Sequence, residues 1–320
     1  MPLLSPHSVS SGKTGITEFT AILFALTGFT SWVLGDSCIK WIGPMGLPPA
    51  EVVGFLGLFM ALTLIVRAAL QRNLSNLRPH SVIRQILRAM LDVGNNLFVV
   101  VALRHLSLTM FYILIFCAPM VVTLLSSLFL GEHITRKKVI ALLLGFGGVV
   151  IAVAPWNHAQ HIDLIGIGSC MICVLCFSTS MVWSRVLTRT ETPDSLAFFS
   201  GIMTALCGAA LTSLHPAPMT QPLLLWLMLA SVFGAIGTLC YYTAVKYTSA
   251  SNVSQYHYTQ LLTGMLISFL VWHDKPGLSV LTGGALIIGS GILIAMAARQ
   301  TGTAKTAPLQ DESATPRIAN

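Results

Sequence analysis

The chain has 320 residues, of which 54% are hydrophobic and only 9% are charged, and its mean hydropathy is +0.78. Because an average soluble domain carries about 25% charged residues, so few charges cannot cover a soluble surface of this size. The net charge of +7 would suit a nucleic-acid-binding protein. However, the basic residues fall between apolar runs, which indicates membrane topology and no nucleic-acid partner.

Apolar runs that are long enough to cross a bilayer recur along the whole chain. Each is near the roughly 20 residues that a membrane-spanning helix needs. We predict an all-α membrane protein with ten transmembrane helices, at 18–39, 49–70, 83–103, 107–130, 137–155, 163–186, 195–214, 222–244, 252–272 and 278–298. Residues 1–17 are expected to form an N-terminal tail, and the polar residues 299–320 a disordered C-terminal tail.

The lysine and arginine residues set the predicted orientation. If the N-terminus is cytoplasmic, 15 of the 18 basic residues lie on or toward the inside, and only Lys40, Arg104 and Lys275 lie outside. The positive-inside rule selects this orientation. Ten spans then leave both termini in the cytoplasm. We therefore expect a multi-pass protein of the plasma membrane, specifically a bacterial inner membrane, surrounded by the lipid bilayer.

An internal repeat is seen when the sequence is compared with itself at an offset of 142 residues. The ungapped offset pairs equal or similar residues, including Ala102 with Ala244, Arg104 with Lys246, Ser107 with Ser249, Glu132 with Asp274 and Gly147 with Gly289. It carries spans three to five onto spans eight to ten. Because five is odd, the two halves, 18–155 and 163–298, would cross the membrane in opposite directions. Inverted five-helix repeats of this kind are frequent in secondary transporters.

The repeat also carries a family pattern. In residues 102–151, a small residue precedes span four, Pro119 lies within that span, and the span ends in Leu-Gly-Glu at 130–132. A glycine-rich helix with Gly-Gly-Val at 147–149 follows. This segment resembles the second half of an EamA domain, which implies the drug/metabolite transporter superfamily. In the second copy Leu261 replaces the proline and His273 the glycine, so the resemblance is weaker there.

The third span carries the acidic residue nearest the middle of the bilayer. Arg88, Asp92, Asn95 and Asn96 share one helical face. An ionisable group at this depth costs roughly 3 kcal/mol, so it should face protein or water. Asp92, with the two asparagines, is therefore a candidate for contacting substrate or accepting a proton. The alternative is an Arg88–Asp92 pair at i, i+4 that neutralises itself.

The ninth span begins with an unusually polar half. Between residues 252 and 260 the only aliphatic residue is Val253. A helix that is polar all round at this depth must be surrounded by protein or line a watery cavity. The sequence therefore predicts that this half-helix forms part of the substrate path, through Asn252, Tyr256, His257 and Gln260. The alternative for its first turn is an ordinary helix start, with Ser251 or Asn252 as the N-cap.

Three further side chains are candidates for a gate or for coupling. Asp36 follows Trp32 by one turn on the first span, and Trp183 lies toward the cytoplasmic end of the sixth. The alternatives are an interfacial Asp36–Lys40 pair and an interfacial anchoring role for Trp183. No metal site or cofactor is predicted, because no histidine or carboxylate lies near the cysteine stripe at 170, 173 and 176 in the sequence.

These features together predict a secondary transporter, not an enzyme, that moves a small polar or amphipathic metabolite or drug by alternating access. The acids and aromatics would suit a cationic or zwitterionic solute. Coupling to protons or to a counter-substrate is a hypothesis that rests on Asp92 and His257. Two alternatives stay open. One is a membrane-embedded enzyme built on the external cluster of His158, His161 and Asp163. The other is an assembly subunit that transports nothing.

Overall fold

The protein is described from a computed structural model, which covers residues 14–131, 136–153, 163–212 and 218–304. All regular structure in these ranges is helical. The elements are α1 (Thr14–Ile42), η1 (Gly43–Met45), α2 (Pro49–Leu70), η2 (Leu74–Leu77), α3 (Val82–His105), α4 (Leu108–Ile115), α5 (Cys117–Leu130), α6 (Arg136–Val153), α7 (Leu164–Leu187), α8 (Pro193–Leu211), α9 (Gln221–Tyr247), α10 (Ala250–Val253), η3 (Ser254–His257), α11 (Tyr258–Trp272) and α12 (Leu278–Ala304).

Within the described residues, seven helical stretches are long and apolar enough to span a membrane. They are Phe19–Met45, Pro49–Leu70, Val82–His105, Leu108–Leu130, Leu164–Leu187, Pro193–Leu211 and Gln221–Tyr247. Three shorter apolar helices accompany them, at Val139–Ala152, Thr259–Trp272 and Leu278–Ser290. The predicted all-α membrane class is confirmed at this level.

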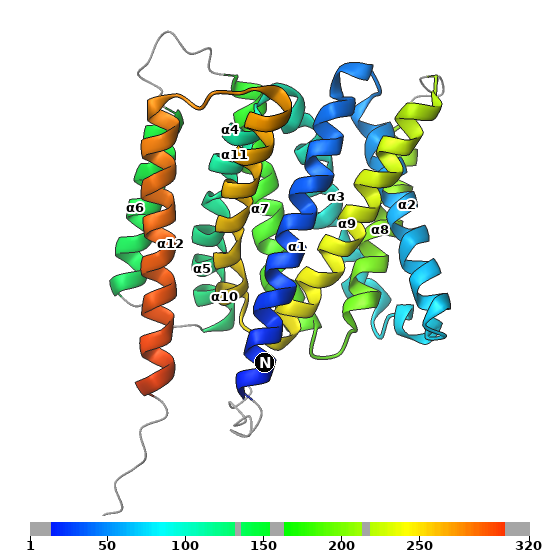
Figure 1. Ribbon diagram of the computed structural model, residues 1–320. Coiled ribbons are helices and arrows are strands. Elements are labelled where there is room, and N and C mark those ends of the chain that lie inside the picture. Colours follow the sequence, from blue (N-terminus) through cyan, green and yellow to red (C-terminus); the bar gives the residue numbers. More distant parts are fainter. Residues whose placement is uncertain (1–13, 132–135, 154–162, 213–217, 305–320) are drawn as a thin grey trace, which may run out of the picture.

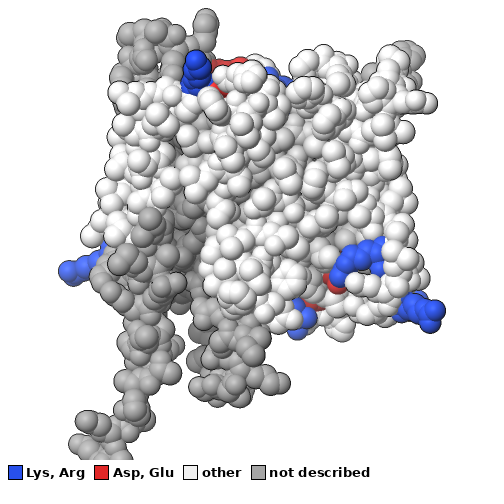
Figure 2. All heavy atoms as spheres, viewed as in Figure 1, with Lys and Arg blue, Asp and Glu red and all other residues white. Residues whose placement is uncertain are grey.

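The helices stand upright side by side and pack in long pairs (Figure 1). Helix α1 packs along α9, α2 along α8, and α3 along α7. Helices α6 and α12 form a fourth pair at the left edge of Figure 1. In the same view α4 lies above α5 in one column and α11 above α10 in another, and α4 contacts α11. The charges on the visible face gather near its upper and lower edges, with a broad uncharged band between them (Figure 2). This distribution suits a bilayer around the middle of the bundle.

The fourth predicted span is not a single helix, because it breaks at Phe116 between α4 and α5. Pro119 explains the position of the break. Its ring lacks an N–H and collides with the carbonyl group four residues earlier, at Ile115. The ninth predicted span is also interrupted, by the 3-10 turn η3 between α10 and α11. Such turns within a helix often mark a hinge or a functional site.

Candidate functional site

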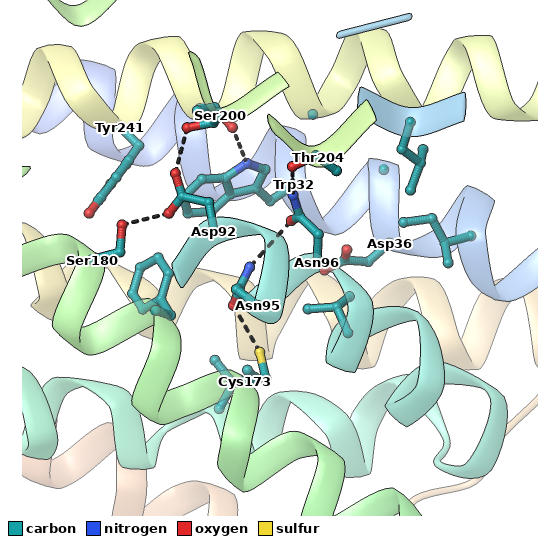
Figure 3. A pocket seen from close by; sticks show the side chains of 18 of the residues that line it. Trp32, Asp36, Asp92, Asn95, Asn96, Cys173, Ser180, Ser200, Thr204 and Tyr241 are labelled. Atoms are coloured by element: carbon teal, nitrogen blue, oxygen red, sulfur yellow. Dashed lines mark hydrogen bonds between the residues drawn. The ribbon is translucent and has the colours of Figure 1, made fainter. Parts of the chain in front are cut away.

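A cavity of about 150 Å³ lies at the centre of the bundle, between helices of both halves of the chain. Seven of the side chains singled out from the sequence line it, namely Trp32, Asp36, Asp92, Asn95, Asn96, His257 and Gln260. They come from α1, from α3 and from the consecutive elements η3 and α11, which are three regions far apart in the sequence. Figure 3 shows the α3 residues facing α7 and α8 across this space.

Asp92 lies in a dense polar cluster with Arg88. The Arg88 side chain is completely buried and donates to Asp92 Oδ2 at 2.7 Å, four residues along the same helix. It also donates to the Tyr242 hydroxyl and, at 2.8 Å, to the carbonyl oxygen of Leu196. Its guanidinium carbon lies 5.0 Å from the centre of the Tyr242 ring, within the range of a cation–π contact. The pair considered from the sequence is therefore formed, and it is part of a larger network.

The carboxylate of Asp92 accepts four hydrogen bonds from its neighbours. Its Oδ2 accepts from Arg88 and from Tyr242 at 2.8 Å. Ser200 also donates to Oδ2, and Ser180 donates to Oδ1 (Figure 3). The donors belong to α3, α7, α8 and α9. Asp92 thus joins the first half of the chain to three helices of the second half. With a positive partner and four donors, its charge is compensated inside the protein.

The two asparagines continue the α3 face beyond Asp92. Asn96 donates to Thr204 Oγ1 at 3.2 Å, and Asn95 accepts from the Cys173 thiol at 3.0 Å (Figure 3). A long contact of 3.4 Å joins the two amides. Both side chains line the cavity. They extend the polar wall toward the middle of the bundle and offer amide donors and acceptors there.

The His257 ring packs against two aromatic rings. Its ring centre is 4.2 Å from that of Phe29 and 4.8 Å from that of Phe177. Its Nδ1 lies 2.8 Å from Gln260 Oε1, and the Gln260 amide nitrogen donates to the carbonyl oxygen of Phe29 at 3.3 Å. His257 Nε2 is buried and has no hydrogen-bond partner among the described residues. Because His257 lines the cavity, this nitrogen is a candidate acceptor for a ligand.

Asp36 takes a different partner from the one considered in the sequence. Its Oδ2 accepts from the Tyr112 hydroxyl of α4 at 2.7 Å. Lys40 donates instead to the carbonyl oxygens of Leu103 and Leu106, and its ammonium lies 5.8 Å from the centre of the Trp272 ring. The described residues contain no Asp36–Lys40 ion pair. One turn before Asp36 on α1, Trp32 donates to Thr238 Oγ1 at 3.3 Å.

Two of the predicted site residues are not brought to the cavity lining. Tyr256 and Trp183 are half-buried and pack against the hydrophobic cluster around Met181 and Tyr242. The interruption at η3 turns His257 toward the cavity while Tyr256 packs elsewhere. The Asn252 side chain lies outside the described residues.

Several cavity-lining residues were not singled out from the sequence. They are Tyr112, Phe177, Ser200, Thr204, Tyr241 and Tyr242. Two patterns point to some of them. Ser200 and Thr204 lie four residues apart in a polar stripe on α8, and Tyr241-Tyr242 interrupts an otherwise apolar span. Phe177 carries no comparable pattern, because a phenylalanine in a membrane helix is more often simply packing.

The enzyme alternative finds little support in the described part of its cluster. Asp163 caps α7 by accepting from the Gly166 N–H at 2.9 Å and pairs with His105 at 2.8 Å. These two contacts hold the pKa of its carboxyl below the usual value. His158 and His161 lie outside the described residues. Among the residues that the structure describes, no group of histidine, cysteine or acidic side chains could hold a metal ion.

Comparison with known proteins places this architecture in a family. The model of the EamA-like transporter family matches residues 19–154 and again residues 164–296. A riboflavin transporter of Brucella anthropi is 25% identical over 84% of this chain and 95% of its own length. A pseudopaline exporter of Pseudomonas aeruginosa is 24% identical over 83% of this chain and 92% of its own.

Two further matches are more limited. An S-adenosylmethionine uptake transporter of Rickettsia bellii is 22% identical over 56% of this chain and 60% of its own. A solved crystal structure matches with a TM-score of 0.68 at 18% identity, covering 91% of this chain and 99% of that one, which supports the fold alone. Because the family model covers nearly the whole chain in two copies, the resemblance seen in the sequence is confirmed, and the protein belongs to the EamA-like transporter family.

Proposed function

We propose that the protein is a secondary transporter that carries a small polar or amphipathic solute across a bacterial inner membrane by alternating access. The observation that carries this proposal is the central cavity, which mixes polar and aromatic side chains and lies between the two halves of the chain. Transporters of this kind bind substrate near the midplane, where the halves meet. The names of the relatives include both uptake and export, so they favour neither direction.

Ten spans in two inverted repeats are part of the proposal, and the helix ends support it. The offset of 142 residues carries the end of α3 at His105 onto the end of α9 at Tyr247. It likewise carries the end of α5 at Leu130 onto the end of α11 at Trp272. The next residues, Gly131 and His273, both have left-handed backbones, with φ of 67° and 56°. Such agreement in register would be unusual in two unrelated halves.

The helix packing has the same symmetry. Exchanging the halves turns the α1–α9 pair into the α7–α3 pair, and each of the other long pairs, α2–α8 and α6–α12, into itself. The two interrupted spans, α4–α5 and α10–α11, also correspond. Two similar units that face each other in opposite orientations could rock about the cavity between them, which is the motion that alternating access needs.

Both termini are proposed to be cytoplasmic, on the strength of the basic residues. A reporter enzyme that is active only outside the cytoplasm tests this directly. Alkaline phosphatase fused after Lys275 should be active, whereas the same enzyme fused after Lys246 or at the C-terminus should be inactive. The reverse pattern would overturn the orientation. Fluorescence of green fluorescent protein at the C-terminus is the complementary control, because it requires a cytoplasmic location.

The substrate path is tested by removing the polar groups of the ninth span. We expect the double variant His257→Leu, Gln260→Leu to weaken substrate binding by at least about tenfold, since two buried hydrogen-bonding groups are lost. Uptake of riboflavin or S-adenosylmethionine into proteoliposomes measures the effect. If neither is carried, an untargeted metabolite comparison of cells lacking and overproducing the protein identifies the solute first.

The matched control for this test is Thr179→Leu, because Thr179 is an exposed residue of α7 whose hydroxyl donates to the Leu175 carbonyl oxygen of its own helix. It should leave transport unchanged. If the double variant transports substrate as well as the wild type does, His257 and Gln260 serve only in packing.

Proton coupling is tested in the same proteoliposomes, because a transporter coupled to protons must respond to a pH gradient. Uptake indifferent to that gradient would leave counter-substrate exchange as the coupling hypothesis.

A further inference from the structure

Among the described residues, the cavity lining contains two acids and no lysine or arginine. The charge of one acid, Asp92, is compensated by Arg88, which also holds Tyr242 and Ser200. For the other acid, Asp36, the described residues supply one hydrogen bond, from Tyr112, and no positive charge. Lys40, one turn further along α1, is engaged with carbonyl oxygens. A desolvated carboxylate without a compensating charge is costly, and for Asp36 either a proton or a cationic ligand would remove that cost.

His257 offers a hydrogen-bond acceptor to the same cavity. The Gln260 amide nitrogen donates to the Phe29 carbonyl, so the Gln260 oxygen must be the atom that faces His257. An amide oxygen only accepts, and therefore His257 Nδ1 carries the hydrogen. In the neutral ring, Nε2 is then a bare acceptor. The His257 side chain is only 3% exposed and this nitrogen has no partner among the described residues, so a donor on a ligand would satisfy it.

A wall of aromatic rings lies beside these two acceptors. The ring centres of Trp32 and Tyr241 are 5.2 Å apart, and Phe177 lies 5.8 Å from Trp32 and 5.7 Å from Tyr241. All three line the cavity. Trp32 and Asp36 are one turn apart on the same face of α1. Such rings favour a flat apolar ligand, and they attract one that is positively charged.

We propose that the cavity selects flat aromatic cations that carry N–H groups. The positive charge would pair with Asp36, an N–H would donate to His257 Nε2, and the ring system would lie against Trp32 and Tyr241. This inference rests on the proposed transport function and narrows its substrate class. Neutral and anionic solutes of similar shape would bind more weakly, because they leave Asp36 without a counter-charge.

Three fluorophores that each contain a flat three-ring nucleus test the effect of charge. Proflavine is a cation at neutral pH, riboflavin is neutral and fluorescein is an anion. Fluorescence anisotropy with the purified full chain in lipid nanodiscs gives the three dissociation constants. We expect proflavine to bind most tightly. Asp36→Asn should weaken proflavine binding by at least about tenfold and change riboflavin binding by less than about twofold.

Two variants make the result specific to charge. Asp36→Glu keeps the carboxylate and should preserve the order of the three ligands, even if the affinities fall. Asp163→Asn removes a carboxylate that is not among the cavity-lining residues while retaining a good N-cap for α7, so it should leave all three dissociation constants unchanged. Gel filtration of each variant confirms that it is folded before binding is compared.

The outcomes separate this inference from the proposed function. Riboflavin or fluorescein binding as tightly as proflavine, or an unchanged proflavine constant in Asp36→Asn, would overturn the cation selectivity while leaving transport in place. No binding of any of the three, together with no loss of solute transport in the His257→Leu, Gln260→Leu variant, would overturn both, because the cavity would then not be the binding site.

Discussion

Replacing Asp92 with Asn should destabilise the protein by about 3–5 kcal/mol, because it leaves the fully buried Arg88 without its counter-charge. The Asp92 side chain is itself only 14% exposed, so water can compensate little of the loss. Tyr242, Ser180 and Ser200 would each lose a bond to a charged acceptor as well. Denaturant or thermal unfolding of the purified protein in detergent measures the effect.

A second variant distinguishes a buried unpaired charge from a general loss of packing. The double variant Arg88→Met, Asp92→Asn removes both charges and should regain most of the lost stability, since buried ion pairs are often replaceable by apolar groups of similar volume. A double variant no more stable than Asp92→Asn would contradict this explanation.

The matched control uses the other acid–arginine pair that the structure describes. Arg67 and Asp194 also form an ion pair, but the Arg67 side chain is 37% exposed. Asp194→Asn should therefore cost less than about 1 kcal/mol. Equal effects of Asp92→Asn and Asp194→Asn would show that burial of Arg88 does not determine the stability of the cluster.

Replacing Gly57 with Ala should destabilise the protein by about 1–3 kcal/mol or more, because the added methyl group has no space. It would lie 2.3 Å from the backbone nitrogen of Ala205 and 2.7 Å from the carbonyl oxygen of Gly201. Both belong to α8, and backbone atoms cannot turn aside as a flexible side chain could. Helices α2 and α8 would have to separate, and in a membrane this close packing is a main source of association.

Gly168 of α7 provides the control, since a methyl group added there meets nothing within 4 Å. Gly168→Ala should leave stability unchanged or raise it by up to about 1 kcal/mol, because alanine favours the helix over glycine. Thermal unfolding in detergent compares the two variants. Equal stabilities would mean that the α2–α8 contact is loose enough to absorb the extra volume.

The membrane class and many of the helices were predictable because they depend on local properties of the chain. A run of about 20 apolar residues must satisfy its own backbone hydrogen bonds in lipid, so it becomes a helix whatever surrounds it. The polar face of α3 followed from the spacing of Arg88, Asp92, Asn95 and Asn96 alone. Even the break in the fourth span has a local cause in Pro119, although the length of its apolar run alone predicts a continuous helix.

The partners of the site residues were not predictable in the same way, because they depend on which helices meet. Asp36 lies one turn from Lys40 in the sequence, yet it binds Tyr112, which lies 76 residues away. Tyr256 and His257 are neighbours in one polar segment, but only His257 lines the cavity. Helical spacing shows which residues share one face of a helix. It does not show which other helix that face will pack against.

The sequence by itself thus determined the membrane class, the family pattern and the residues too polar to face lipid, since these follow from composition and spacing along a single helix. Only the tertiary structure decided that Arg88 compensates Asp92 while no cation in the described part of the chain pairs with Asp36. It also decided that His257 Nε2, which lies beside an aromatic wall, has no hydrogen-bond partner among the residues that the structure describes. Those features arise from contacts between α1, α3, α4, α7, α8, α9 and α11, and such contacts exist only once the helices have packed.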